Sequence, residues 1–136
     1  LMEGEGQMIM LSGSQYTGSW RKGKMQGLGV MVFPNGDVYE GEWHKGRRHG
    51  NGLLKSLNGA TYIGSWENGQ RHGHGVLTNV VATKSSYLTT HIPFRVVEGD
   101  TYDGEWQRGM RHGIGTVHRD GRVLYQGEFL NDKRDG

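Results

Sequence analysis

The sequence contains no cysteine, and only two of its 136 residues are proline. Without cysteine the chain can form neither disulfides nor a thiolate metal site, and it has no thiol nucleophile. No stretch approaches the ~18 consecutive apolar residues of a membrane span, and no signal-peptide pattern is present. The net charge of +2 is too small to indicate a class of partner. Cytoplasmic exposure is the simplest interpretation of these absences.

Glycine is abundant, with 25 residues, and it recurs at fixed offsets. The stretch Tyr39–Gly52 recurs in similar form as Tyr16–Gly29, Tyr62–Gly75 and Tyr102–Gly115, and in degenerate form as Tyr125–Gly136. Successive copies start 23 residues apart, except for one interval of 40, which contains an insertion of 17 residues. A fixed period near this length indicates a repeat architecture rather than a two-layer globular core.

The chain is therefore interpreted as one array over residues 1–136. It has a partial repeat at 1–15, repeats starting at 16, 39, 62, 102 and 125, and an insertion at about 80–97. Val, Thr, Tyr and Ile in the insertion favour a lengthened hairpin, with Pro93 at an edge or bend. Both ends fall inside a repeat, so we expect a fragment of a longer array.

The alternation within each repeat predicts a β-hairpin. Tyr39, Gly41 and Trp43 are two residues apart, so in a strand they share one face, while Glu40 and Glu42 share the other. Gly50-Asn51-Gly52 is expected to begin the returning strand, after a loop that contains Gly46. Asn-Gly pairs, a strong signal for hairpin turns, precede the next tyrosine at residues 35–36 and 58–59. Asp120-Gly121 lies one residue further from its tyrosine, which predicts a bulge or register adjustment.

The frame Tyr-x-Gly-x-Trp-x-x-Gly-x-x-x-Gly-x-Gly resembles the MORN repeat, the membrane occupation and recognition nexus family. Together with the alternation, the resemblance implies an all-β fold: a single-layer, twisted antiparallel sheet of tandem β-hairpins that curves into an open trough. The resemblance also implies scaffolds at membranes, junctions, ciliary axonemes and the cell cortex, with self-association through array ends. Some members are joined to a catalytic domain.

An aromatic stripe on a glycine floor is expected to line the trough, since a strand glycine leaves bare backbone on which a ring can lie. Its main role is expected to be the core of the sheet, and its exposed edges are a candidate surface for an extended or helical segment of a partner protein. The stripe consists of Tyr16, Trp20, Tyr39, Trp43, Tyr62, Trp66, Tyr102 and Trp106.

Basic residues cluster between the two halves of each repeat and are expected to form a rim along one edge of the sheet. Such a rim suits phosphate groups, anionic lipid headgroups or an acidic segment, although charged loops also serve solubility alone. The rim consists of Arg21, Lys22, Lys24, Lys45, Arg47, Arg48, Arg71, Arg108 and Arg111. Acidic residues at 37, 98, 100 and 120 are expected beside the turns of the opposite edge.

Catalytic and metal chemistry find little support. His49, His72 and His112 recur at hairpin spacing, roughly 9–10 Å, which is too far apart for two of them to share one zinc ion. The Glu40/Glu42 pair lies on the outer face of a strand without a partner base. No nucleophile–base set and no phosphate-binding loop is present, so we expect no catalytic residues, no metal and no cofactor. The small net charge and the acidic outer face also weigh against nucleic acid.

The sequence thus predicts a non-catalytic scaffold that binds a protein segment along the trough, in a membrane-cortical or cytoskeletal assembly of the cytoplasm. One alternative is a module that binds acidic phospholipids, phosphoinositides in particular. Another is a regulatory domain of a larger enzyme.

Overall fold

A computed structural model describes residues 1–80 and 100–134. The predicted insertion, from residue 81 onward, lies outside the described residues. The described chain forms eleven β-strands, which are hydrogen-bonded in sequence order within one sheet. The strands are β1 (Gly4–Ile9), β2 (Gln15–Arg21), β3 (Lys24–Val32), β4 (Val38–His44), β5 (Arg47–Lys55), β6 (Thr61–Glu67), β7 (Gln70–Val80), β8 (Asp100–Gln107), β9 (Met110–Arg119), β10 (Arg122–Leu130) and β11 (Lys133–Arg134).

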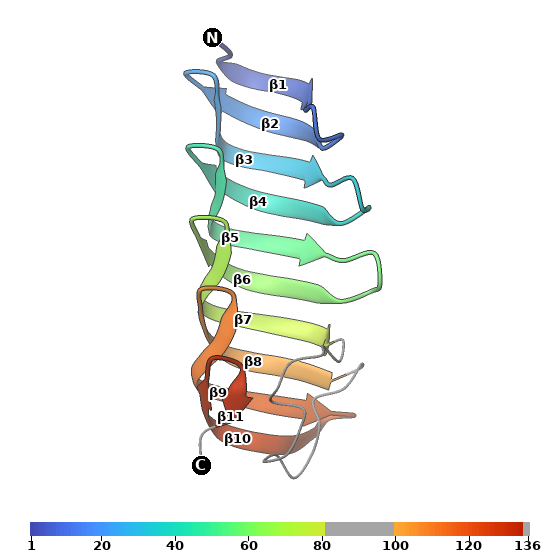
Figure 1. Ribbon diagram of the computed structural model, residues 1–136, viewed down its shortest axis with the longest axis vertical. Coiled ribbons are helices and arrows are strands. Elements are labelled where there is room, and N and C mark those ends of the chain that lie inside the picture. Colours follow the sequence, from blue (N-terminus) through green and yellow to red (C-terminus); the bar gives the residue numbers. More distant parts are fainter. Residues whose placement is uncertain (81–99, 135–136) are drawn as a thin grey trace.

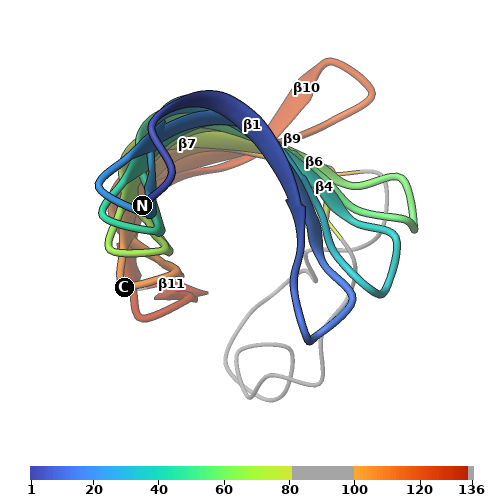
Figure 2. The ribbon, with the colours of Figure 1, turned by 90° about the horizontal axis from the view of Figure 1, so that it is seen from above.

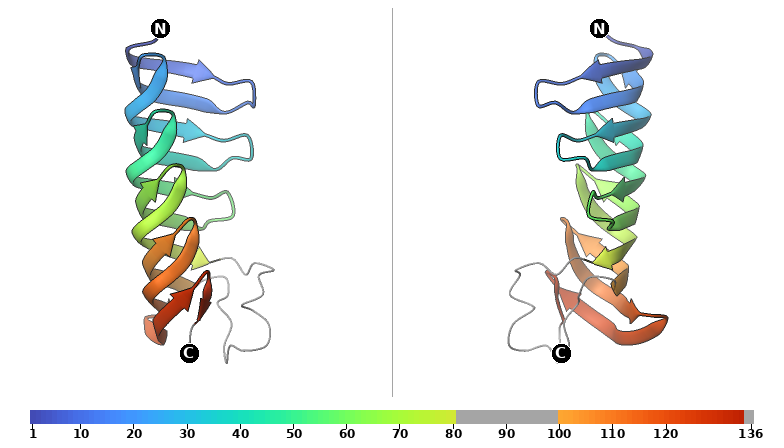
Figure 3. Two further views of the ribbon diagram at one scale, coloured as in Figure 1. Left: turned by 60° about the vertical axis from the view of Figure 1, so that its left-hand side comes forward. Right: turned by 90° about the vertical axis from the view of Figure 1, so that its right-hand side faces the viewer.

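The sheet is a simple antiparallel meander in which each strand pairs only with its sequence neighbours (Figure 1). The described strands make a single layer, with the two ends of the chain near opposite ends of its long axis (Figures 1 and 3). Within the described residues no helix is long and apolar enough to span a membrane. The prediction of an all-β, single-layer sheet of tandem hairpins that does not close is confirmed.

Two-residue turns join the two strands of each full repeat. In the β2–β3 turn, Lys22 and Gly23 both have positive φ, at 50° and 77°, and Lys45 and Gly46 do the same in the β4–β5 turn, at 49° and 82°. This geometry matches the right-handed twist of the flanking strands. Because the turn is so short, β5 already begins at Arg47. The expectation that the returning strand starts near Gly50 was therefore wrong.

The Asn-Gly pairs lie at turns as predicted, but in longer loops. In the β3–β4 loop only Gly36 has positive φ, at 94°. The Asn35 side chain instead accepts a hydrogen bond from the backbone amide of Asp37, at 3.0 Å. These loops lie at the opposite edge of the sheet from the two-residue turns (Figure 1).

The last repeat departs from this pattern in the predicted place. Asp120 and Gly121 form a tight turn with positive φ at both residues, and the β9–β10 register shifts between Val123 and Tyr125. The β9–β10 hairpin consequently points away from the other hairpins (Figure 2). The predicted register adjustment after Asp120-Gly121 is confirmed.

The two strands within each full repeat are paired through a bulge that bends the sheet. Between the pairs Gly41–Gly52 and Trp43–Arg48, the single residue Glu42 on β4 lies opposite three residues on β5. The same shift occurs in the β2–β3, β6–β7 and β8–β9 pairs. Extra residues on one strand bend it and increase its twist, and the strands curve into an open arch (Figure 2).

The two faces of this arch differ in composition. We call the face that carries the Tyr and Trp side chains the aromatic face, and the opposite face the outer face. The Tyr39 hydroxyl bonds to the carbonyl of Glu42, three residues further along its own strand. An extended strand advances roughly 10 Å over three residues, so the strand must bend toward the tyrosine for this bond to form. The aromatic face is therefore the concave one.

Candidate partner-binding surfaces

Each repeat tyrosine lies flat on glycine backbone and is tied to its own strand. A Cβ added at Gly52 would come within 2.1 Å of the Tyr39 hydroxyl, and one at Gly41 would come within 2.6 Å of the Asn51 carbonyl oxygen. The hydroxyls of Tyr16, Tyr62 and Tyr102 donate to the carbonyls three residues further on, at 2.7–2.9 Å, as Tyr39 does. The expected glycine floor beneath the rings is confirmed.

Burial makes these hydroxyls hard to ionise. It raises the pKa of Tyr16 and of Tyr62 to about 12, and it raises the pKa of Tyr39 and Tyr102 still further. The hydroxyls therefore stay protonated, as hydrogen-bond donors, well above neutral pH.

Each tryptophan links its repeat to the one before. The Trp43 indole Nε1 donates to the carbonyl of Gly29 at 3.1 Å, and the Trp66 indole donates to Gly52 at 3.2 Å. The Tyr39 ring contacts both tryptophans edge-to-face, with centroid distances of 5.1 and 5.3 Å. The result is a continuous aromatic ladder along the long axis. Phe129 takes the tryptophan place in the last repeat, 5.0 Å from the Tyr102 ring.

Burial decides what a partner could touch on the aromatic face. The four predicted tyrosines are 0–1% exposed and the four tryptophans 4–6% exposed. The eight side chains predicted to bind a partner therefore form the core of the sheet. The accessible apolar surface is a partly buried layer packed against them, which consists of Met2, Met10, Met25, Phe33, Leu54, Leu77, Leu124 and Tyr125.

Three residues of the predicted basic rim instead lie on this aromatic core. The Arg48 guanidinium lies 4.7 Å from the Trp66 ring centre and donates to the Gly69 carbonyl, and Arg71 lies 4.5 Å from Trp106 and donates to Gly109. Desolvation lowers the pKa of both arginines. A guanidinium stacked on an indole is favourable because the ring face is electron-rich.

The third of these arginines is the most buried. Arg111 is 4% exposed, and its backbone amide and Nε both donate to Asp132 Oδ1, at 2.7 and 3.1 Å. The first repeat has Met25 at the register position that Arg48 occupies in the second, opposite the repeat tryptophan. A methionine at this position indicates that its main requirement is to cover an indole.

The other six predicted rim residues are exposed: Arg21, Lys22, Lys24, Lys45, Arg47 and Arg108. A hollow of about 400 Å³ lies where the first two turns of this edge meet, lined by Arg21, Lys22, Lys24 and Lys45 together with Gln26 and His44. The Lys45 backbone amide donates to the Gln26 side-chain oxygen at 3.0 Å, which joins the two turns. Cationic side chains thus converge there on one solvent-accessible place.

The histidines are dispersed along the array. His49 lies beside His44, with ring centres 5.2 Å apart, and His72 pairs with Glu67 at 3.4 Å. In the part of the chain that the structure describes, no group of three or more His, Cys, Asp or Glu side chains could hold a metal ion.

One charged pair was missed by the sequence analysis. Asp100 was expected among solvated turn acids, but its side chain is fully buried and accepts hydrogen bonds from Arg119 Nε and Nη2, at 2.7 and 3.1 Å. The Asp100 carboxylate raises the pKa of Arg119 through these bonds. Asp100 opens β8 and Arg119 directly precedes the Asp120-Gly121 turn, so no local sequence signal distinguishes them from solvated charges.

Comparison with known proteins agrees with the geometry. The sequence model of the MORN repeat matches residues 16–38, 39–61, 62–80, 102–120 and 125–136. No curated protein matches the chain. The matched segments begin at the five tyrosines that open the repeats and cover well over half of the sequence. The family found is a structural repeat and not a catalytic domain. The chain therefore belongs to the MORN-repeat family.

Proposed function

We propose that this array is a non-catalytic scaffold that binds a segment of a partner protein along its aromatic face. The setting that we infer from the family is a cytoplasmic assembly at a membrane, the cell cortex or the cytoskeleton. The proposal rests mainly on one observation: the concave face presents an apolar layer, including Met25, Phe33, Leu54 and Leu77, that no other described element covers. Exposed apolar surface of this kind typically marks an interaction site.

The aromatic ladder supports this role by keeping the surface rigid. Tyr and Trp rings held by hydrogen bonds and edge-to-face contacts cannot rearrange freely, so a partner would meet a preformed surface. Binding to a preformed site loses less conformational entropy than binding to a mobile one. The partner is therefore expected to supply apolar side chains that pack against Leu54, Leu77 and their neighbours.

A peptide selection tests this function. Random peptides displayed on phage would be selected against the 136-residue chain, and the enriched peptides would be mapped by methyl NMR. We expect shifts at Leu54 and Leu77. We also expect Leu54→Asn to weaken binding at least about tenfold, because it removes apolar contact from a buried centre, a loss of about 1.4 kcal/mol.

The matched control is Ile63→Asn on the neighbouring strand β6. Ile63 is 61% exposed and its Cα partner is Leu53, whereas Leu54 pairs with the buried Tyr62. Circular dichroism would establish that both variants fold. Equal affinity for the two variants, or a selection that yields only peptides bound elsewhere, would refute binding along the aromatic face.

A second function, binding of acidic phospholipids, is favoured by the cationic hollow of Arg21, Lys22, Lys24 and Lys45. A phosphorylated headgroup carries several negative charges and fits such a cluster. Each Lys or Arg near an anionic membrane surface contributes roughly 1 kcal/mol, within a Debye length of about 8 Å at physiological salt.

Vesicle co-sedimentation tests the lipid function. We expect vesicles with phosphoinositide to sediment the chain at low salt, and the double substitution of Lys22→Asn with Lys45→Asn to weaken this binding. Asparagine suits the positive φ of these turn positions because Asn68 occupies the equivalent place in the third repeat. As a control, neutral substitutions of Lys55 and Arg122 also remove two positive charges, and they should have little effect on vesicle binding. Equal losses in the two double variants would show nonspecific attraction only.

A further inference from the structure

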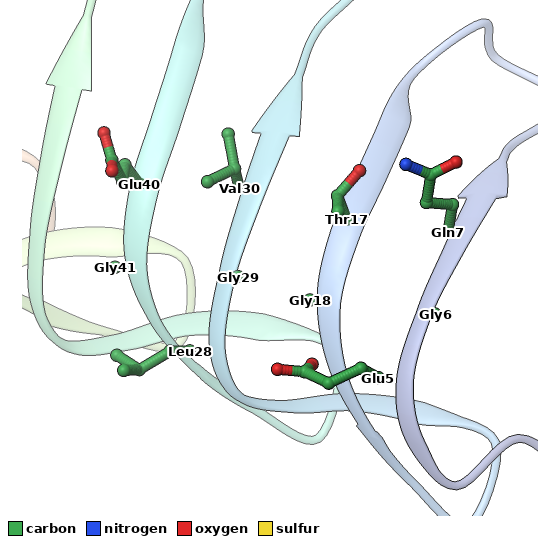
Figure 4. Close-up of a pocket in the computed structure, with 10 residues that line it drawn as sticks. All are labelled: Glu5, Gly6, Gln7, Thr17, Gly18, Leu28, Gly29, Val30, Glu40 and Gly41. Carbon is green, nitrogen blue, oxygen red and sulfur yellow. The ribbon is translucent and has the colours of Figure 1, made fainter.

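The outer face carries an open groove that the proposed function does not use. It has a volume of about 680 Å³ and crosses β1 to β4. Its floor is the bare backbone of Gly6, Gly18, Gly29 and Gly41, which are mutual register neighbours across the four strands. Side chains rise on both sides of this glycine row, with Glu5 and Leu28 on one side and Thr17, Val30 and Glu40 on the other (Figure 4).

The apolar side chains of this groove are not needed for the core. Leu28 is 68% exposed, and Val30 is only partly buried. Neither belongs to the hydrophobic cluster that holds the sheet together, which lies on the aromatic face. Their apolar surface is therefore available to a ligand.

The ionisable groups that line the groove are all acidic. Among the described residues these are Glu5 and Glu40, and no Lys, Arg or His lines it. Glu5 accepts a hydrogen bond from the Ser19 hydroxyl at 3.1 Å. The exposed Glu40 carboxylate has no hydrogen-bond or ion-pair partner among the described residues. Apolar surface flanked by carboxylates is complementary to a ligand that is both apolar and cationic.

Strand geometry determines how far apart the two cationic groups of such a ligand must lie. Glu5 lies on β1 and Glu40 on β4, three strand spacings or roughly 14 Å apart across the strands. Because Glu40 is in register with Gln7 and not with Glu5, the two glutamates are also offset by two residues, or roughly 7 Å, along the strands, so a peptide that reaches both crosses the glycine row obliquely. An extended peptide advances about 3.3 Å per residue, and alternate side chains point the same way. Side chains at positions i and i+4 of the peptide are thus about 13 Å apart on one side, with that of i+2 between them.

We propose that the groove binds an extended segment of a partner protein with the pattern basic–x–apolar–x–basic. The two basic residues pair with Glu5 and Glu40, and the central apolar residue packs between Leu28 and Val30 above the glycine row. This site is separate from the aromatic face, so the array can hold two different segments at the same time. Exposed ion pairs are screened by salt, and the complex weakens as ionic strength rises.

Methyl NMR of the full chain tests this site with a defined probe, the peptide acetyl-Gly-Arg-Ser-Leu-Ser-Arg-Gly-amide at low salt. We expect shifts at the Leu28 and Val30 methyls, while Met31 and Leu54 on the aromatic face stay unchanged. Replacing Glu5 and Glu40 by glutamine should weaken binding at least tenfold. Glu128→Gln, on β10 far from the groove, should leave the affinity unchanged.

A peptide with both arginines replaced by glutamate provides the matched ligand control, and it should not bind. Equal affinity of the two peptides, equal affinity of the wild type and the double glutamine variant, or shifts confined to Met31 and Leu54 would each overturn the proposal. Absence of saturable shifts at millimolar peptide would overturn it as well. These outcomes leave the test of the aromatic face unaffected, because that test reads Leu54 and Leu77.

Discussion

Replacing Gly41 by valine should destabilise the array by about 4 kcal/mol or more, or prevent it from folding. A Cβ at this position would lie 2.5 Å from the Gly52 Cα and 2.6 Å from the Asn51 carbonyl oxygen, both of which are backbone atoms of the paired strand. Backbone cannot move aside as a flexible side chain can, so β4 and β5 would have to separate. The measurement is the free energy of unfolding by urea titration, followed by circular dichroism.

Glu40→Val is the matched control, since it introduces the same side chain one residue earlier in the same strand. Glu40 is exposed on the outer face, and valine favours strands, so we expect a change within about 0.5 kcal/mol. Glu42 would be a poorer control because its carboxylate accepts a hydrogen bond from the Asn51 amide at 2.7 Å. Similar losses in Gly41→Val and Glu40→Val would contradict the assignment of the two faces.

Raising the pH above about 10 should unfold the array. Tyrosine in an unfolded chain has a pKa near 10, whereas burial raises the pKa of Tyr16 and Tyr62 to about 12 and that of Tyr39 and Tyr102 further. Because the folded pKa exceeds the unfolded pKa, the unfolded state releases protons first. Stability is fully present below about pH 10 and is lost progressively as the pH rises toward 12.

The expected slope is about 1.4 kcal/mol per pH unit for each tyrosine, or about 5 kcal/mol per unit for the four together. Urea titrations at a series of pH values would measure it, and near-ultraviolet absorbance would report ionised tyrosine. Tyr39→Phe should reduce the slope by about one quarter, since it removes one of the four buried tyrosines whose pKa is raised. Tyrosines that ionise near pH 10 while the sheet stays folded would contradict this prediction.

The repeat architecture could be predicted from the sequence because it depends on local spacing. Tyr39, Gly41 and Trp43 alternate in a strand, and their recurrence with a constant period places equivalent residues on adjacent strands. The glycine floor follows from the same pattern, because a ring on one strand needs a neighbour without a side chain. Both features depend on spacing within a repeat and between neighbouring repeats, so neither requires knowledge of a distant contact.

The roles of the charged residues could not be predicted in this way. Arg48 follows a turn and was grouped with the solvated loop cations, although the structure places it on the Trp66 ring. Its position depends on the bulge opposite Glu42, which shifts the register so that Arg48 faces Trp43 across the strands. Asp100 gives a similar case, because its burial depends on Arg119 in another strand. A bulge changes which face a residue occupies, and alternation alone does not show where one occurs.

The candidate sites also combine features that local spacing predicts with features that depend on contacts between strands. The eight predicted trough residues lie on the aromatic face but are buried, and the accessible apolar surface there belongs to Leu54, Leu77 and similar residues, whose positions in the returning strands carry no strong motif. The groove on the outer face depends on Glu5 and Glu40 from strands of two different repeats. Only the register of β1 to β4 in the sheet shows that both residues line the same groove.

The tryptophan bonds between repeats also show that the array does not depend on how its strands are connected. Trp43 and Trp66 bond to a glycine 14 residues earlier, and Trp106 makes the same bond to Gly75 across a separation of 31 residues. The additional chain between β7 and β8 leaves the bond length at 3.1 Å. The edge of the sheet at which β7 is connected to β8 can therefore accommodate additional chain while the bond between neighbouring repeats keeps its length.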